Sequence, residues 1–209
     1  MKALILVDIQ NDFLPGGPLG VPEGNAVVPV ANRLIPHFDL VVATQDWHPA
    51  NHGSFATNHA GRQPGEIMEL NGLAQVLWPV HCVADSLGAE FAGELNTAAI
   101  RRVFPKGTNP GVDSYSGFFD NDRKNSTGMG DYLRAAKVET LYVLGLATDY
   151  CVKATAMDGV TLGFDTYLVR DGCRGVNLAP GDVERAEEMM QAAGITLITS
   201  AAVMKGDQI

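Results

Sequence analysis

Short apolar runs alternate with longer amphipathic stretches along the whole chain. The first run, residues 3–9, is apolar apart from Asp8, a pattern typical of a strand covered on both faces. Further β-rich runs follow at residues 40–44, 102–104, 140–146, 166–170 and 195–199. Between the runs the pattern predicts amphipathic helices at about residues 27–38, 87–96, 130–137, 149–162 and 182–193.

This alternation predicts the α/β class. Parallel neighbours in a sheet need crossover connections, so the pattern favours a three-layer αβα sandwich around a mostly parallel six-stranded sheet. No repeat, low-complexity tract or linker marks a boundary, and residues 1–209 are predicted to form a single domain. Residues 11–25 and 48–79 lack strong periodicity, and loops of that length are usually functional.

Composition and charge narrow the classes of function. The 209 residues are 46% hydrophobic and 19% charged, which is too apolar for a disordered chain. A net charge of −9 argues against a nucleic-acid or membrane partner, since phosphate contacts need clustered basic residues. No apolar run reaches the roughly 20 residues of a membrane span. The run after Lys2 stops at Asp8 without a cleavage site, so a cytoplasmic protein is predicted.

Three chemically active side chains fall near the ends of predicted strands. Asp8 ends the first run, Lys106 follows run 102–104, and Cys151 lies in the first turn of the helix after run 140–146. Ligands bind beyond the carboxyl ends of the strands in open α/β sheets, so all three should project from one rim. An ammonium group and a helix N-terminus stabilise a thiolate, and a carboxylate can take its proton. The set predicts a cysteine nucleophile with Asp8 as general base.

Each residue also has a structural interpretation. Asp8 could bond a neighbouring loop, Lys106 could be a solvated turn residue, and Cys151, one of three cysteines predicted to be free thiols, could simply be packed in a helix. For each residue taken alone, the structural interpretation is favoured. The occurrence of all three together favours a catalytic site. The turn before the helix adds free N–H groups, and those of Ala147 and Cys151 could hold a tetrahedral oxyanion, alongside helix capping by Thr148 or Asp149.

A second group of residues has the pattern of a metal site. Asp46 and His48 point the same way from an extended segment, and His81 follows in the same histidine-rich region. One carboxylate and two imidazoles with open positions suit Zn, Fe(II) or Mn, although hydrogen-bonded loop histidines are the alternative. His52 and His59 are reserve ligands or outer partners. Phe13 and Trp78 flank both groups; either could be core packing, or the two could hold a flat ring between them.

Several segments resemble the nicotinamidases of the isochorismatase-like cysteine hydrolases. They are residues 7–13 (VDIQNDF), 45–55 (QDWHPANHGSF), 78–82 (WPVHC), 104–107 (FPKG), 113–118 (DSYSGF), 145–152 (GLATDYCV) and 169–173 (VRDGC). The segments follow the family's order and cover nearly the whole chain. The resemblance implies the isochorismatase-like fold and hydrolysis of nicotinamide to nicotinic acid and ammonia in NAD salvage, with pyrazinamide as a second substrate.

The resemblance also implies a role for each residue of the site. Its catalytic triad falls on Asp8, Lys106 and Cys151, and its oxyanion amides fall on Ala147 and Cys151, with a cis peptide bond between Leu146 and Ala147. Its ring-holding aromatics fall on Phe13 and Trp78. Its metal ligands fall on Asp46, His48 and His81, with zinc favoured over iron or manganese and with His52 left open as a fourth ligand.

Other functions stay open at this point. An N-carbamoyl amide hydrolase of the same superfamily would share the triad without needing the metal set. Vinyl-ether hydrolysis of the isochorismatase type would not need Cys151, and a non-catalytic nicotinamide- or metal-binding module belongs to a different class. The expected partner is a small-molecule substrate, nicotinamide, and a homo-oligomer is compatible with the sequence.

Overall fold

Six parallel strands form the central sheet of the computed structural model, which describes residues 1–205. The strand order is β5-β2-β1-β6-β7-β8. The strands span Lys2–Val7 (β1), Leu40–Asp46 (β2), Arg102–Lys106 (β5), Thr140–Leu146 (β6), Asp165–Arg174 (β7) and Thr196–Ile198 (β8). The prediction of an α/β fold with six strands is confirmed, and the sheet is parallel throughout.

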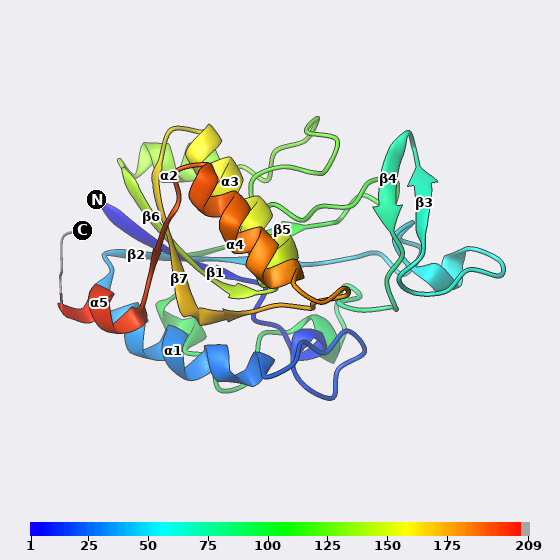
Figure 1. Cartoon of the computed structure of the whole chain (residues 1–209), viewed down its shortest axis with the longest axis horizontal. Helices are drawn as coiled ribbons and strands as arrows, with labels where there is room; N and C mark the ends of the chain where they lie inside the picture. Colours follow the sequence, from blue (N-terminus) through cyan, green and yellow to red (C-terminus); the bar gives the residue numbers. More distant parts are fainter. Residues whose placement is uncertain (206–209) are drawn as a thin grey trace.

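Helices cover both faces of this sheet (Figure 1). One side carries α1 and α5, and the other carries α2, α3 and α4. They span Val27–Leu34 (α1), Met129–Ala135 (α2), Lys153–Thr161 (α3), Asp182–Ala192 (α4) and Ser200–Lys205 (α5). The predicted three-layer sandwich is therefore confirmed.

The central strands are apolar because both of their faces are covered. All five residues from Ala3 to Val7 are fully buried, as are Leu141, Val143 and Leu144 of the neighbouring β6. Their side chains join one continuous core with the apolar stripes of the surrounding helices, such as Val27, Ala31 and Leu34 of α1. Burial of this continuous apolar surface is the main stabilising term of the fold.

One predicted helix is wrong. Residues 87–96 form only a short 3₁₀ turn, Leu87–Ala89, followed by a loop that turns again at residues 93–95. Gly88 and Gly93 lower the helix propensity of the segment, and Phe91 instead pairs with Gln10 in an isolated antiparallel bridge. This loop buries Ala89, Ala92 and Leu95, whereas Leu87 is exposed.

Two other differences have local causes. Helix α1 ends at Leu34 rather than at residue 38, because Pro36 cannot donate an N–H and its ring clashes with the preceding turn. The segment 48–79 contains a hairpin of β3 (Ile67–Leu70) and β4 (Leu73–Val76), which projects from the sheet in Figure 1. The hairpin turns at Asn71 and Gly72, both at positive φ, and this Asn-Gly pair is a turn signal that the hydrophobic pattern alone does not contain.

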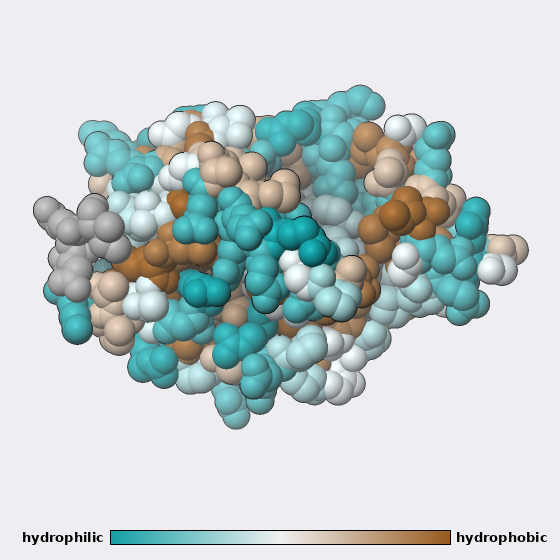
Figure 2. Space-filling view, viewed as in Figure 1, coloured by the Kyte–Doolittle hydropathy of each residue, from teal (hydrophilic) through white to brown (hydrophobic). Residues whose placement is uncertain are grey.

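The surface is mostly polar on the face shown in Figure 2, where apolar side chains form separate patches. Among residues 1–205, no helix has the length and apolar character needed to cross a membrane. The topology itself points to the site. The chain builds β1, β2 and β5 on one side and then returns to place β6 against the other side of β1. Ligands bind at such a reversal of strand order, beyond the carboxyl ends of the strands.

Candidate active site

The ends of β1, β2 and β5 bring three charged side chains together beneath the surface. Asp8 directly follows β1 and turns the chain away from the sheet with a φ of 48°, while Asp46 and Lys106 are the last residues of β2 and β5. Asp46 and Lys106 are paired in the ladder between those strands. None of the three side chains is more than 7% exposed. The strands therefore fix a buried cluster of two carboxylates and one ammonium group.

Lys106 is the centre of this cluster. Its Nζ lies 2.9 Å from Asp8 Oδ2 and 3.4 Å from Cys151 Sγ, and it donates to Asp46 Oδ1. It also donates to the backbone carbonyl of Ser114 at 2.9 Å. A carboxylate oxygen of Asp8, one of Asp46 and the Sγ atom of Cys151 all lie within 4.8 Å of one another. The structure thus brings together the Asp8, Lys106 and Cys151 side chains that the sequence analysis selected.

The charges of the cluster follow from its burial. Burial alone would lower the pKa of Lys106, but the Asp46 and Asp8 carboxylates hold it well above its usual value. Burial would raise the pKa of Asp46, yet Lys106 and His48 hold it well below its usual value. For Asp8, burial dominates and raises the pKa, against the opposing effect of Lys106. Lys106 and Asp46 therefore form a stable ion pair, and Asp8 is the more readily protonated carboxyl group.

The pKa of the Cys151 thiol is shifted in the opposite direction to the one expected from the sequence. Burial raises the pKa of Cys151 well above its usual value, and the Asp8 and Asp46 carboxylates raise it further. Lys106 lowers the pKa, as predicted, but does not outweigh these effects. Cys151 therefore rests as a thiol, and its proton has to be taken by a base before it can attack.

Cys151 lies in a π-helical turn, Thr148–Val152, that follows β6 and leads into α3. The Ala147 carbonyl accepts hydrogen bonds from the N–H groups of Tyr150 and Val152, both at 3.1 Å. The peptide bond between Leu146 and Ala147 is cis, as the resemblance implies. Ala147 and Cys151 both line the pocket.

Asp46 also belongs to a second group, which has the geometry of a metal site. Its Oδ2 lies 3.5 Å from His48 Nε2 and 3.8 Å from His81 Nε2, so its two oxygens face different partners. One ligand atom from each of Asp46, His48 and His81 lies within 4.8 Å of the others, and all three residues are buried. A carboxylate and two imidazoles form a donor set for a divalent metal ion.

Backbone carbonyls orient both imidazoles. His48 Nδ1 is 2.9 Å from the Gly107 carbonyl and His81 Nδ1 is 2.8 Å from the Pro79 carbonyl, which leaves each Nε2 directed toward Asp46. The His48 ring also lies against the backbone of Gly107, whose φ is 64°. A Cβ atom at position 107 would lie 2.3 Å from His48 Cε1. Only glycine leaves room for the ring there.

His52 lies directly beside His48, where His48, His52 and Asp113 also bring possible ligand atoms within 4.8 Å of one another. His52 packs its ring 4.3 Å from that of His48, and its Nδ1 is 2.7 Å from Ser54 Oγ. Its buried Nε2 has no hydrogen-bond partner among the described residues. Burial, with His48 nearby, lowers the pKa of His52 to about 4, which keeps its ring neutral. His59 is farther along the loop and lies 2.7 Å from the Gly53 carbonyl through its Nε2.

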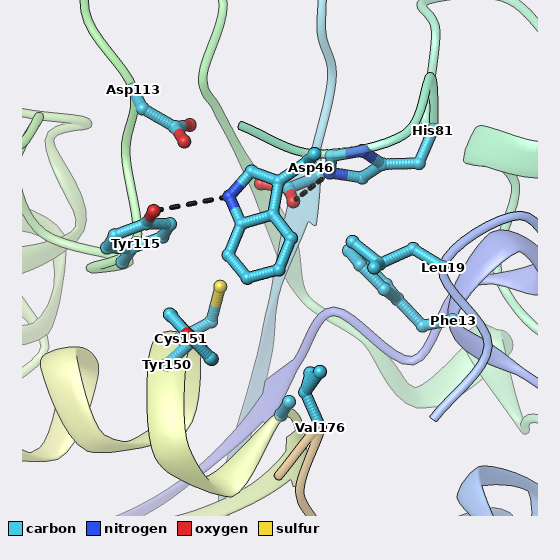
Figure 3. A pocket seen from close by; sticks show the side chains of 11 residues that line it. Phe13, Leu19, Asp46, His81, Asp113, Tyr115, Tyr150, Cys151 and Val176 are labelled. Carbon is cyan, nitrogen blue, oxygen red and sulfur yellow. Dashed lines mark hydrogen bonds and ion pairs between the residues drawn. The ribbon is translucent and has the colours of Figure 1, made fainter. Parts of the chain in front are cut away.

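An aromatic-lined cavity opens above the thiol. In Figure 3 the Cys151 sulfur points into this cavity, toward the side where Asp46 and His81 lie. Phe13 and Trp78 contribute aromatic surface to it, as predicted from the sequence. Five further residues line the cavity that were not predicted from the sequence: Leu19, Asp113, Tyr115, Tyr150 and Val176.

Some of these residues had a sequence signal and others had none. Asp113 and Tyr115 belong to a segment of the family resemblance, and Tyr150 directly precedes Cys151. Tyr115 Oη accepts from Trp78 Nε1 at 3.2 Å and thereby fixes the indole. Leu19 and Val176 are ordinary apolar residues in loops, and only the folded chain brings them to the cavity.

Asp149 anchors the wall that carries Val176. Its carboxylate accepts hydrogen bonds from the N–H groups of Val176 at 2.9 Å and Asn177 at 2.8 Å. Because Asp149 lies in the same turn as Cys151, one short segment holds both the thiol and this part of the pocket wall.

Comparisons with known proteins agree with this site. A model of the isochorismatase domain family matches residues 2–202. Nicotinamidase from Escherichia coli is 53% identical over 204 residues, covering 96% of this chain and 95% of that protein. The structure of an Acinetobacter baumanii nicotinamidase and pyrazinamidase superposes with a TM-score of 0.94 at 44% identity, covering 97% of both chains.

A zinc-bound relative bears on the metal group. Pyrazinamidase from Pyrococcus horikoshii, solved in complex with zinc, superposes with a TM-score of 0.77 at 40% identity. The match covers 95% of this chain and 98% of that one. These comparisons confirm the resemblance found in the sequence. With a family model that matches almost all of its length, the chain belongs to the isochorismatase domain family.

Proposed function

We propose that this chain is a metal-dependent cysteine amidohydrolase that converts nicotinamide to nicotinic acid and ammonia, and that also accepts pyrazinamide. The observation that carries the proposal is the buried cluster in which Lys106 Nζ lies 2.9 Å from Asp8 and 3.4 Å from Cys151 Sγ, at the base of an aromatic-lined cavity. The 53% identity to the E. coli nicotinamidase supports the same substrate.

In the first stage Cys151 becomes acylated. Asp8 accepts the Sγ proton, and the thiolate attacks the amide carbon to give a tetrahedral intermediate. The N–H groups of Ala147 and Cys151 stabilise its oxyanion. Asp8 then donates the proton to the departing nitrogen, the C–N bond breaks, and ammonia leaves behind a thioester on Cys151.

In the second stage water cleaves the thioester. Asp8 accepts a proton from the attacking water, the C–S bond breaks, and the proton passes to the Cys151 sulfur as nicotinic acid leaves. Lys106 keeps its charge throughout, because the two carboxylates raise its pKa. Its role is to hold Asp8 and the sulfur at their short separation and to offset the charge that passes between them.

The residues that would hold the metal ion are Asp46, His48 and His81. The donor set fits, since both Nε2 atoms face the Asp46 carboxylate and both Nδ1 atoms contact backbone carbonyls. When bound, a divalent ion supplies a Lewis-acid position for the pyridine nitrogen or a water molecule. Zinc is the ion we propose, with the zinc-bound P. horikoshii relative in support and with iron(II) or manganese as the other ions that this donor set suits.

Phe13 and Trp78 would hold the flat ring of the substrate between them. Phe13 also lies against His81, with ring centroids 5.5 Å apart, so the aromatic surface reaches the metal group. A ring bound there would place its nitrogen toward Asp46, His48 and His81 and its amide toward Cys151. Asp46, His81 and Cys151 line the same cavity, which supports a substrate that reaches both groups.

The decisive experiment measures ammonia release from nicotinamide before and after chelation, followed by titration with zinc, iron(II) or manganese. We expect release by the untreated protein, loss after chelation and recovery with one of these ions. His81→Ala should require far more metal for the same recovery. Absence of ammonia release by metal-loaded protein would contradict the proposed function. Faster turnover of an N-carbamoyl amide than of nicotinamide would favour the alternative hydrolase.

A further inference from the structure

Gln10 has a buried side-chain amide next to the site, and both of its donor hydrogens and its oxygen make hydrogen bonds there. Its side chain is completely buried. Its Nε2 donates to the carbonyls of Asp46 and Ala89, both at 2.8 Å, and its Oε1 accepts from the Asp46 N–H, also at 2.8 Å. The amide therefore binds the main chain of Asp46 on both sides of its Cα atom.

The position of Asp46 in the sheet explains why its main chain needs these hydrogen bonds from Gln10. The ladder between β1 and β2 ends at the pair Leu6 and Ala43, because β1 stops at Val7 and Asp8 turns the chain away. On its other side, β2 remains paired to β5 through Asp46 and Lys106. Gln10 supplies, from a side chain, the two main-chain hydrogen bonds that an extension of β1 would have made to Asp46.

Asp46 is the residue for which this support has the largest consequence. One carboxylate oxygen contacts Lys106, and the other faces His48 and His81 at 3.5 and 3.8 Å. A small rotation of the Asp46 backbone would move both oxygens at once.

We propose that Gln10 is a positioning residue, which fixes the Asp46 main chain so that its carboxylate serves Lys106 and the metal group together. This inference rests on the proposed function for its catalytic consequence, but it makes a separate statement about metal affinity. Outer partners that orient metal ligands typically change affinity by about 10- to 100-fold when they are removed.

The chain offers a matched control in Gln45. Its Nε2 donates to the same Ala89 carbonyl at 2.8 Å, and its own side chain makes no hydrogen bond to Asp46 among residues 1–205. Gln45→Met removes one donor from the Ala89 loop, whereas Gln10→Met removes that kind of bond together with both bonds to Asp46. The comparison therefore separates support of the loop from support of the metal ligand.

The test measures the zinc dissociation constant of the full chain by competition with a chromogenic chelator, together with thermal unfolding. In Gln10→Met the constant should rise roughly 10- to 100-fold, whereas in Gln45→Met it should change by less than about threefold. Gln10→Glu keeps an acceptor for the Asp46 N–H and the side-chain shape but loses both donated bonds. It should also bind zinc more weakly, and it provides a second variant if Gln10→Met does not fold.

Equal zinc affinity in wild type and in any folded Gln10 variant would overturn the inference. An equal loss in the Gln10→Met and Gln45→Met variants would also overturn it, because the effect would then come from the Ala89 loop. Ammonia release by the wild type is measured separately. A wild type that binds zinc but does not hydrolyse nicotinamide would remove the proposed function while leaving the zinc comparison valid.

Discussion

The two sides of the pocket are built in different ways. On one side, Asp8, Asp46 and Lys106 come from the ends of neighbouring strands and hold one another through buried charge. On the other side, Leu19, Trp78 and Val176 come from loops and contribute mainly apolar surface. The strand ends are fixed by ladder hydrogen bonds, while the loops depend on a few contacts such as those of Asp149 and Tyr115.

This difference separates the chemistry of the site from the fit of its substrate. Groups that move protons or bind a metal need positions defined to within a fraction of an ångström, which strand ends provide. Apolar loop residues exclude water and define the shape of the ligand. Substitutions of Asp8, Asp46 or Lys106, the strand-end side, should therefore change turnover or folding. Substitutions of Leu19, Trp78 or Val176, the loop side, should change substrate affinity.

The largest effect is expected for Cys151→Ala. Loss of the nucleophile should lower kcat by about 10⁴-fold or more, since catalytic groups that act as a unit fail together. The thiol is a small buried group, so thermal unfolding should shift by only a few degrees. Ammonia release and circular dichroism measure the two quantities. Turnover within tenfold of wild type would rule out Cys151 as nucleophile.

Lys106→Met tests the buried charges of the strand-end side. The variant leaves Asp8 and Asp46 without their shared cation, and breaking a buried pair in this way typically costs about 3–5 kcal/mol. Urea unfolding at neutral pH measures the loss, which should shrink at low pH, where the carboxyl groups bind protons. Unchanged stability at neutral pH would contradict the buried ion cluster.

Trp78→Leu tests the loop side. The variant loses an aromatic wall and the hydrogen bond to Tyr115, so KM for nicotinamide should rise by about tenfold, with kcat changing much less. Tyr115→Phe is the control, because it removes the acceptor of the indole N–H and keeps the ring. Steady-state kinetics on both variants check the result. A fall in kcat at constant KM would place Trp78 with the chemical groups instead.

The smallest effect is expected for Leu19→Ala. The residue is partly exposed, and its truncation should raise KM by only about two- to fivefold. It should also admit ring-substituted nicotinamides that the wild type turns over poorly, which competition between the two substrates would reveal. Loss of turnover with every substrate would show that Leu19 supports the fold of its loop.

The strand-end side was largely predictable from the sequence. Asp8 lies at the end of the first predicted run, and Asp46 and Lys106 each follow a predicted run by two residues, so the order of strands brings the three charges together. The contact of Asp46 with Lys106 was not predicted. The thiol pKa was not predictable in the same way. The helix N-terminus and the lysine favour thiolate, but the opposing burial and carboxylates depend on distances that only the folded chain defines.

The loop side was less predictable for a physical reason. Leu19 and Val176 carry no chemical signature. Leu19 is held within its own loop by a hydrogen bond to the Asp12 carbonyl, and Val176 is held by Asp149 from another part of the chain. The error at residues 87–96 has the same origin: an apolar spacing near that of a helix serves a loop, because Gly88 and Gly93 weaken the helix and Phe91 bridges to Gln10. Hydrophobic patterns report which residues are buried more reliably than which backbone buries them.

Because Gly107 has no room for a side chain, loss of activity on substituting it would not identify it as a catalytic residue. Any side chain there would overlap the His48 imidazole, although residue 107 offers no group to substrate or metal. A random screen would therefore register position 107 as intolerant, like a catalytic residue. The cause would be a steric clash that displaces the His48 ring, and a compensating substitution would be expected near His48.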